Sequence, residues 1–158
     1  MRTAPATFLL LLAIGCSPTP QPDKTNTGIA SFHRELAAMK VALNDSTPDE
    51  FRSQRLKLLA CYEEHRTELA SLQTDFRTLT RILEHLEQMF PQVINHPHLI
   101  LDKPGLADSM HEMNSSVGIE KTYLVTSNIT NRSLFVHASF IAARLCDMLR
   151  SRLDSQAK

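Results

Sequence analysis

The chain has 158 residues, which suits one compact domain or one extended helical assembly and excludes a second catalytic core. Its 17 basic residues balance 17 acidic ones and no dense Lys or Arg run is present, so nucleic acid is not an expected partner. Four glycines, no tryptophan and abundant Leu, Ala, Glu and Arg predict an all-α fold, either a long antiparallel helical hairpin or a small helical bundle with coiled-coil-like heptads.

The first 15 residues have the layout of a signal peptide. Arg2 supplies a charged start, residues 8–14 (FLLLLAI) form an apolar run, and Gly15 is the small residue that a cleavage site needs. The run is too short for a stable membrane-spanning helix, which needs about 20 apolar residues. The sequence therefore predicts export.

The residue after the predicted cleavage site is a cysteine, in the sequence Leu12-Ala13-Ile14-Gly15-Cys16. This segment resembles the lipobox of bacterial lipoproteins, in which the cysteine thiol receives a diacylglycerol before the leader is cut. The resemblance is confined to the leader, and it implies lipidation at Cys16 and attachment to a membrane through the lipid. By the sorting rule of that family, a serine at position 17 implies the outer membrane, with the protein facing the periplasm.

Residues 16–28 are polar and rich in proline, so they are predicted to be a flexible tether between the anchor and a helical domain over 29–158. Cleavage by ordinary signal peptidase after Gly15 is the alternative, and it would release the chain without a lipid.

The first predicted helix covers about 29–43, because apolar residues recur there at helical spacing. The segment 44–50 (NDSTPDE) is predicted to end this helix and begin another. Thr47 or Ser46 can cap, Pro48 fits a first turn, and two acidic residues favour a helix N-terminus.

A heptad-like seam follows without interruption, and it predicts one helix over 48–89, about 40 residues long, which Pro91 ends. Ten of its twelve positions are apolar or aromatic. The seam consists of Phe51, Arg55, Leu58, Tyr62, His65, Leu69, Leu72, Phe76, Leu79, Leu83, Leu86 and Phe90.

Turn residues predict a loop from Pro91 to Gly105, where the chain reverses. A last helix is predicted over 119–153; its stripe is clear after Asn131, whereas the β-branched stretch 123–126 is open to another local structure.

Cys61 and Cys146 are a single pair in an exported chain, where oxidation is permitted. If the helices 48–89 and 119–153 pack antiparallel, the two cysteines lie at equal distances from the turn. The sequence therefore predicts a disulfide between them.

Four of the six asparagines lie in the N-glycosylation pattern Asn-X-Ser/Thr, more than this composition gives by chance. If the chain is a eukaryotic secreted protein, these are its glycan sites: Asn44, Asn114, Asn128 and Asn131.

The seven histidines show no spacing typical of a zinc site, and neither a phosphate-binding glycine loop nor a nucleophile motif is present. We therefore expect no metal, no cofactor and no enzyme activity. His65 lies on the seam, where a polar residue more often fixes register than binds a ligand.

These features predict a lipid-anchored structural or adaptor protein that binds protein partners of an envelope, secretion or conjugation assembly. The alternative is a secreted glycoprotein ligand that resembles the four-helix cytokines, which would explain the sequons. The tight connection 44–47 argues against it, because cytokine bundles use long crossovers. The heptad seam also offers a route to a homo-oligomer.

Overall fold

The computed structural model describes residues 24–101, 108, 111, 114, 115, 117 and 129–156. Within these residues the chain is a bundle of four helices, so the predicted all-α class is confirmed. The predicted leader, the predicted acylation site Cys16 and the first part of the predicted tether lie outside the described residues. The helices are α1 (Lys24–Asp45), α2 (Pro48–Glu64), α3 (Gln73–Asn95) and α5 (Asn131–Gln156).

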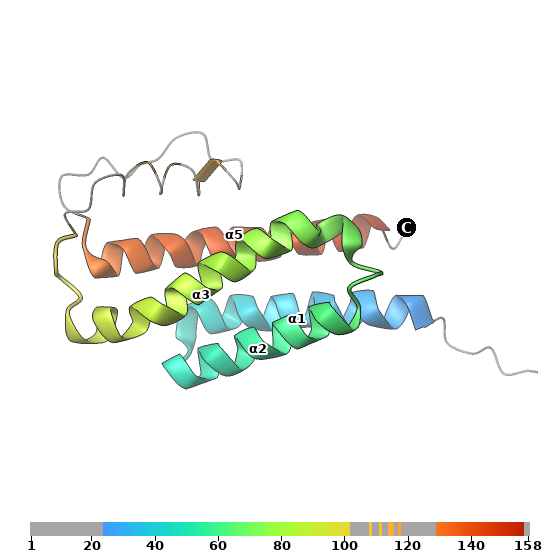
Figure 1. The fold of residues 1–158 in the computed structure, drawn as a ribbon, viewed down its shortest axis with the longest axis horizontal. Helices are drawn as coiled ribbons and strands as arrows, with labels where there is room; N and C mark the ends of the chain where they lie inside the picture. Colours follow the sequence, from blue (N-terminus) through green and yellow to red (C-terminus); the bar gives the residue numbers. More distant parts are fainter. Residues whose placement is uncertain are drawn as a thin grey trace, which may run out of the picture.

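The helices run alternately up and down, each antiparallel to the one before it (Figure 1). α1 packs against α2 and α5, and α3 packs against α5 and, over a smaller area, α2. α2 and α5 therefore sit on opposite corners of the bundle. The start of α1 and the end of α5 lie at one end of the bundle, and the end of α3 and the start of α5 lie at the other.

α1 begins at Lys24, so the end of the predicted tether is helical rather than extended. Gly28 lies inside this helix and is buried. A β-carbon at this position would overlap the side chains of His65 and Glu68, so glycine here permits close packing between α1 and the segment after α2.

α2 begins where the sequence predicts, at a complete capping box. The Glu50 amide donates to Thr47 Oγ1 at 3.4 Å, and the Thr47 amide donates to Glu50 Oε2 at 2.8 Å. The hydrogen bond from the Thr47 amide, and a second one from the Thr47 hydroxyl, lower the pKa of the Glu50 carboxyl. Pro48 occupies the first helical position, where its missing amide hydrogen costs nothing.

The predicted unbroken helix over 48–89 is wrong. α2 ends at Glu64, the chain reverses over 65–72 through a 3₁₀ turn (Ala70–Leu72), and α3 begins at Gln73. The reason is length: α1 has 22 residues and α5 has 26, so within a single chain these two helices can cover a seam of 42 residues only if the seam is folded in half.

The seam itself is buried as predicted, since all twelve of its side chains are buried or half-buried. Nearly all of its apolar members belong to one core with residues of α1 and α5. The seam is therefore filled within one chain, and it does not present a free surface for the homo-oligomer that the sequence suggested.

Pro91 does not end α3, which continues to Asn95. Its nitrogen cannot donate to the Glu87 carbonyl, so one helical hydrogen bond is lost. Apolar contacts on both sides of the proline hold the last turn: Phe90 packs edge-on against Phe51, and Val93 packs on a small cluster that includes Met89.

α5 begins at Asn131, later than the predicted start of 119. Residues 119–128 lie outside the described part of the chain, and neither Ile129 nor Thr130 is helical. The start is set by reciprocal hydrogen bonds: the Ser133 amide donates to Thr130 Oγ1 at 3.1 Å, and the Thr130 amide donates to Ser133 Oγ at 2.8 Å. The predicted helix after Asn131 is confirmed, and it runs on to Gln156.

Three aromatic rings from three helices meet in the core. Tyr62 stacks on Phe76 with 3.9 Å between ring centroids, and Phe32 contacts both rings at 5.8 and 5.4 Å. The Tyr62 hydroxyl is buried, and it has no hydrogen-bond partner among the residues that the structure describes. A buried hydroxyl without a partner loses its hydration without compensation.

We therefore expect Tyr62→Phe to keep or raise the free energy of unfolding, by up to about 1 kcal/mol, because it removes an unsatisfied group and keeps the stacked ring. Urea denaturation followed by circular dichroism measures the change. A loss of more than about 1 kcal/mol would mean that the hydroxyl makes a stabilising hydrogen bond.

Candidate functional site

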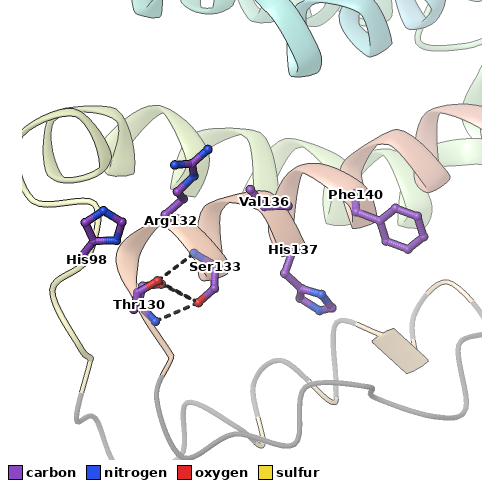
Figure 2. Close-up of a pocket in the computed structure, with 7 residues that line it drawn as sticks. All are labelled: His98, Thr130, Arg132, Ser133, Val136, His137 and Phe140. Atoms are coloured by element: carbon purple, nitrogen blue, oxygen red, sulfur yellow. Dashed lines mark hydrogen bonds between the residues drawn. The ribbon is translucent and has the colours of Figure 1, made fainter.

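A groove of about 570 Å³ lies over the first turns of α5, at the bundle end opposite the start of α1 (Figures 1 and 2). It combines apolar side chains with imidazole, guanidinium and hydroxyl groups, a composition suited to contact with another protein. It is lined by His98, Thr130, Arg132, Ser133, Val136, His137 and Phe140.

Backbone pairing fixes one wall of this groove. The segment after α3 runs antiparallel to the residues before α5, with an isolated bridge between Ile100 and Thr130. The Leu101 amide donates to the Ile129 carbonyl at 2.7 Å, and the Asn131 amide donates to the Leu99 carbonyl at 3.1 Å. His98 and Thr130 thus line the same groove although 31 residues lie between them in the sequence.

The buried side chain of Asn131 stabilises this pairing. Its side chain is 1% exposed, and its Nδ2 donates to the His96 carbonyl at 2.9 Å. The same carbonyl accepts from the Leu99 amide at 3.2 Å. One buried amide therefore ties the end of α3 to the start of α5 and gives the groove a fixed wall.

The exposed part of the groove is apolar. Val136 and Phe140 lie four residues apart on one side of α5, with 59% and 53% of their surface exposed (Figure 2). Leu99 and Ile100, on the neighbouring segment, are also exposed. Contiguous exposed apolar residues with a polar rim mark a site of protein contact more often than a scattered residue does.

His137 points into the groove between these two apolar residues (Figure 2). Burial lowers the pKa of its imidazole below the usual 6.5, and its Nε2 is buried with no hydrogen-bond partner within the described part of the chain. The folded protein therefore keeps this ring neutral under conditions in which an exposed histidine would begin to charge.

The lowered pKa predicts an acid-sensitive contribution to stability. The unfolded chain binds a proton at His137 more readily than the folded one, so this contribution is complete above about pH 6.5 and is lost as the pH falls toward the folded pKa. We expect His137→Gln to reduce the fall in melting temperature between pH 7 and pH 5. Equal slopes in the two proteins would exclude this histidine as a source of the acid sensitivity.

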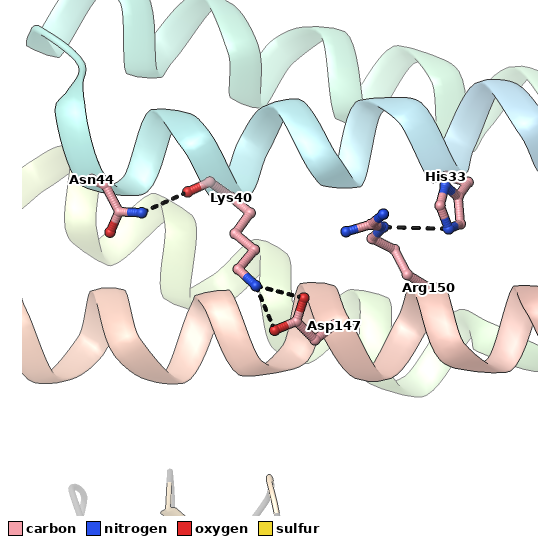
Figure 3. A network of polar contacts seen from close by, with 5 residues as sticks. All are labelled: His33, Lys40, Asn44, Asp147 and Arg150. Carbon is pink, nitrogen blue, oxygen red and sulfur yellow. Dashed lines mark hydrogen bonds and ion pairs between the residues drawn. The ribbon is translucent and has the colours of Figure 1, made fainter.

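A row of polar contacts joins α1 to α5 on another face (Figure 3). Lys40 Nζ donates to both carboxylate oxygens of Asp147 at 2.7 and 2.8 Å, and Arg150 Nε donates to His33 Nε2 at 3.3 Å. The Lys40 and Asp147 side chains keep about two fifths of their surface exposed, so the pair contributes about 1 kcal/mol or less. These contacts align the helices and have no feature of a reactive site.

The two cysteines of the helical domain are free thiols in the structure. Cys61 lies half-buried on α2 and Cys146 lies buried on α5, the two helices at opposite corners of the bundle. The prediction that they lie at equal heights assumed an antiparallel pair of long helices, and the reversal after Glu64 removes that pair.

Burial raises the pKa of both thiols, with a further contribution from Glu35 at Cys61 and from Asp147 at Cys146. The pKa of Cys146 reaches about 12, so its thiol stays protonated at neutral pH and is a poor nucleophile.

The candidate glycan acceptors differ in their exposure. Asn44 is exposed at the end of α1 and donates from Nδ2 to the Lys40 carbonyl at 3.4 Å. Asn114 and Asn131 are each 1% exposed, and a glycan on Asn131 would displace the bond to His96. Asn128 lies outside the described residues. Two of the four acceptors are thus placed where this fold leaves no room for a glycan.

The groove was not predicted from the sequence, although one signal for it was present. Val136 and Phe140 are apolar residues of the last predicted helix that do not belong to its core-facing stripe. A second apolar strip on an amphipathic helix indicates a second contact surface. The pairing of Ile100 with Thr130 has no comparable signal, because it depends on the tertiary contact at Asn131.

Within the ranges that the structure covers, no group of three His, Cys, Asp or Glu side chains could hold a metal ion. The described helices include none that is both long and apolar enough to cross a membrane. No family model, no curated protein and no solved structure matches this chain.

Proposed function

We propose that this protein is a lipid-anchored adaptor of a bacterial envelope, acylated at Cys16, which holds a helical bundle in the periplasm and binds a protein partner of an envelope, secretion or conjugation assembly. The observation that carries the proposal is the exposed apolar groove at the bundle end remote from the chain's N-terminal side. The lipobox-like leader supplies the anchor, and the groove supplies the partner site.

The arrangement suits an anchored protein. α1 starts only eight residues after Cys16, and its 22 residues carry the chain about 33 Å along the bundle. The groove is at the far end of that length. A partner held there approaches from the side away from the lipid anchor, where the membrane does not obstruct it.

The secreted-ligand alternative receives less support from the bundle. Four-helix cytokines run up-up-down-down with two long crossover connections, whereas this chain alternates direction and joins α1 to α2 through two residues. The burial of Asn114 and Asn131 also removes part of the sequon excess that favoured a glycoprotein. Asn44 remains an exposed acceptor and keeps the alternative testable.

The anchor is tested by the intact mass of the protein from its native membrane fraction. We expect a species that begins at Cys16 and carries fatty acyl mass, and we expect Cys16→Ser to lack that mass. Cys61→Ser is the matched control, because it also removes a thiol but should keep the acyl mass. A ladder of masses that collapses with a deglycosidase, on an unacylated chain, would overturn the proposal in favour of the secreted ligand.

The partner site is tested separately by placing a photo-crosslinking amino acid at Val136 in living cells. The control position is Val41, a valine on α1 that is exposed to a similar extent. We expect a discrete adduct with one envelope protein from position 136 and none from position 41. Identical adducts from both positions, or no adduct from either, would exclude the groove as the binding site.

A further inference from the structure

The reversal between α2 and α3 contains no residue that breaks a helix. Residues 65–72 (HRTELASL) include neither glycine nor proline, and most of them are good helix formers. The seam keeps its spacing of three and four through the reversal, with His65, Leu69 and Leu72 facing inward. Local sequence and tertiary structure therefore favour different conformations for this one segment.

Part of the backbone of the reversal is already close to helical. The His65 amide donates to the Cys61 carbonyl and the Leu69 amide to the His65 carbonyl, both with helical spacing. The φ angles at His65, Leu69 and Leu72 are −111°, −97° and −98°. None of these three is left-handed, so each of these residues can reach a helical conformation by rotation within allowed backbone space.

The reversal separates the bundle into two helical hairpins, α1 with α2 and α3 with α5. The contacts between the hairpins are made by side chains: Tyr62 stacks on Phe76, Arg55 pairs with Glu87, and Lys40 pairs with Asp147. None of these contacts requires that both hairpins belong to the same chain.

We propose that a second copy of this chain is a partner, through exchange of hairpins at residues 65–72. α2 and α3 then join into one helix over 48–95, about 72 Å long, and α1 with α2 of each copy packs against α3 with α5 of the other. Because the seam holds its phase through the joint, the same side chains face the core on both sides of it. The result is a closed two-fold dimer that leaves no unpaired surface.

This inference does not depend on the lipid anchor or on the groove. The groove is built from residues within the α3–α5 hairpin, so each dimer carries two intact grooves. Exchange would therefore double the number of partner sites without altering either one.

The test uses the mature protein, refolded at high concentration from an equal mixture of ¹⁵N-labelled and unlabelled copies and separated by size. A zero-length carbodiimide crosslinker joins Lys40 to Asp147, whose Nζ and carboxylate oxygen are 2.7 Å apart. We expect the dimer fraction to yield Lys40–Asp147 peptide pairs of mixed isotope, and the monomer fraction to yield pairs of one isotope only. Pairs of one isotope only in the dimer fraction, or no dimer at all, would overturn the proposal.

Two variants of exposed residues distinguish exchange from ordinary surface association. Thr67→Gly combined with Ala70→Gly disfavours the continuous helix at four positions per dimer, and we expect the dimer dissociation constant to rise by roughly 100-fold or more. Thr67→Ala favours the helix and should lower the constant. A dissociation constant that does not change in either variant would exclude the joined helix.

Discussion

Replacing Phe76 by Ala is expected to lower the free energy of unfolding by about 3 to 5 kcal/mol, the largest effect of any single substitution proposed for this chain. Phe76 is 4% exposed and lies where α1, α2 and α3 meet. Its removal would end the stack with Tyr62 and the edge contact with Phe32. Neighbours held by three helices cannot collapse fully into the space, so a cavity remains.

The matched control is Phe140→Ala, the same chemical change at an exposed position of α5. We expect that variant to lose no more than about 0.5 kcal/mol, because the removed ring is already in contact with water. A domain of this size is stable by only about 5 to 15 kcal/mol, so urea titrations of the Phe76 variant are best made near 15 °C. A loss below about 1 kcal/mol at Phe76 would mean that the three helices do not meet around this ring.

The heptad seam shows how far sequence periodicity reaches. All twelve of its positions are buried or half-buried, because hydrophobic burial depends on which face of a helix is apolar, although it missed the buried residues Ile82 and Met89. It did not identify the reversal at 65–72. Periodicity contains no information on whether the groups that cover a seam come from one long partner or from two short ones.

Gly28 and Pro91 mark two boundaries that were misplaced, the end of the predicted tether and the end of the predicted long helix. Gly28 lies within α1, at a position where His65 and Glu68 approach too closely for a β-carbon. Pro91 lies within α3 because apolar contacts at Phe90 and Val93 hold the turn that follows it. Both residues are usually helix breakers, but tertiary packing decided the outcome at both positions.

Capping residues were more reliable guides. The start of α2 was predicted correctly from Thr47, Pro48 and Glu50, whose interactions are local and need no other element. The start of α5 has equally local hydrogen bonds between Thr130 and Ser133. A capping signal of this kind at 130–133 was present in the sequence, although the prediction did not use it.

The Glu87 carboxylate of α3 pairs with two arginines of α2. Glu87→Met is therefore expected to lower the free energy of unfolding by about 2 kcal/mol. Arg55 donates to this carboxylate from Nε at 2.7 Å, and Arg52 lies 2.8 Å from its other oxygen. The Arg55 and Glu87 side chains are only 14% and 18% exposed. Without Glu87, the Arg55 guanidinium would keep only Glu84, at 3.6 Å on the bundle surface.

Because Glu87 has two arginine partners, removing Arg55 should cost less stability than removing Glu87. A double-mutant cycle can measure this difference. Arg55→Met leaves Glu87 paired with Arg52, so we expect a loss of about 1 kcal/mol, half that of Glu87→Met. The double variant Arg55→Met, Glu87→Met should lose less than the sum, because no buried charge is left without a partner. The pair Glu63 with Arg66, exposed on both sides, is the control and should show a coupling below about 0.5 kcal/mol. If the two cycles gave the same coupling, the Arg55 contact would be an ordinary surface ion pair, and the junction of α2 with α3 would depend on the apolar core alone.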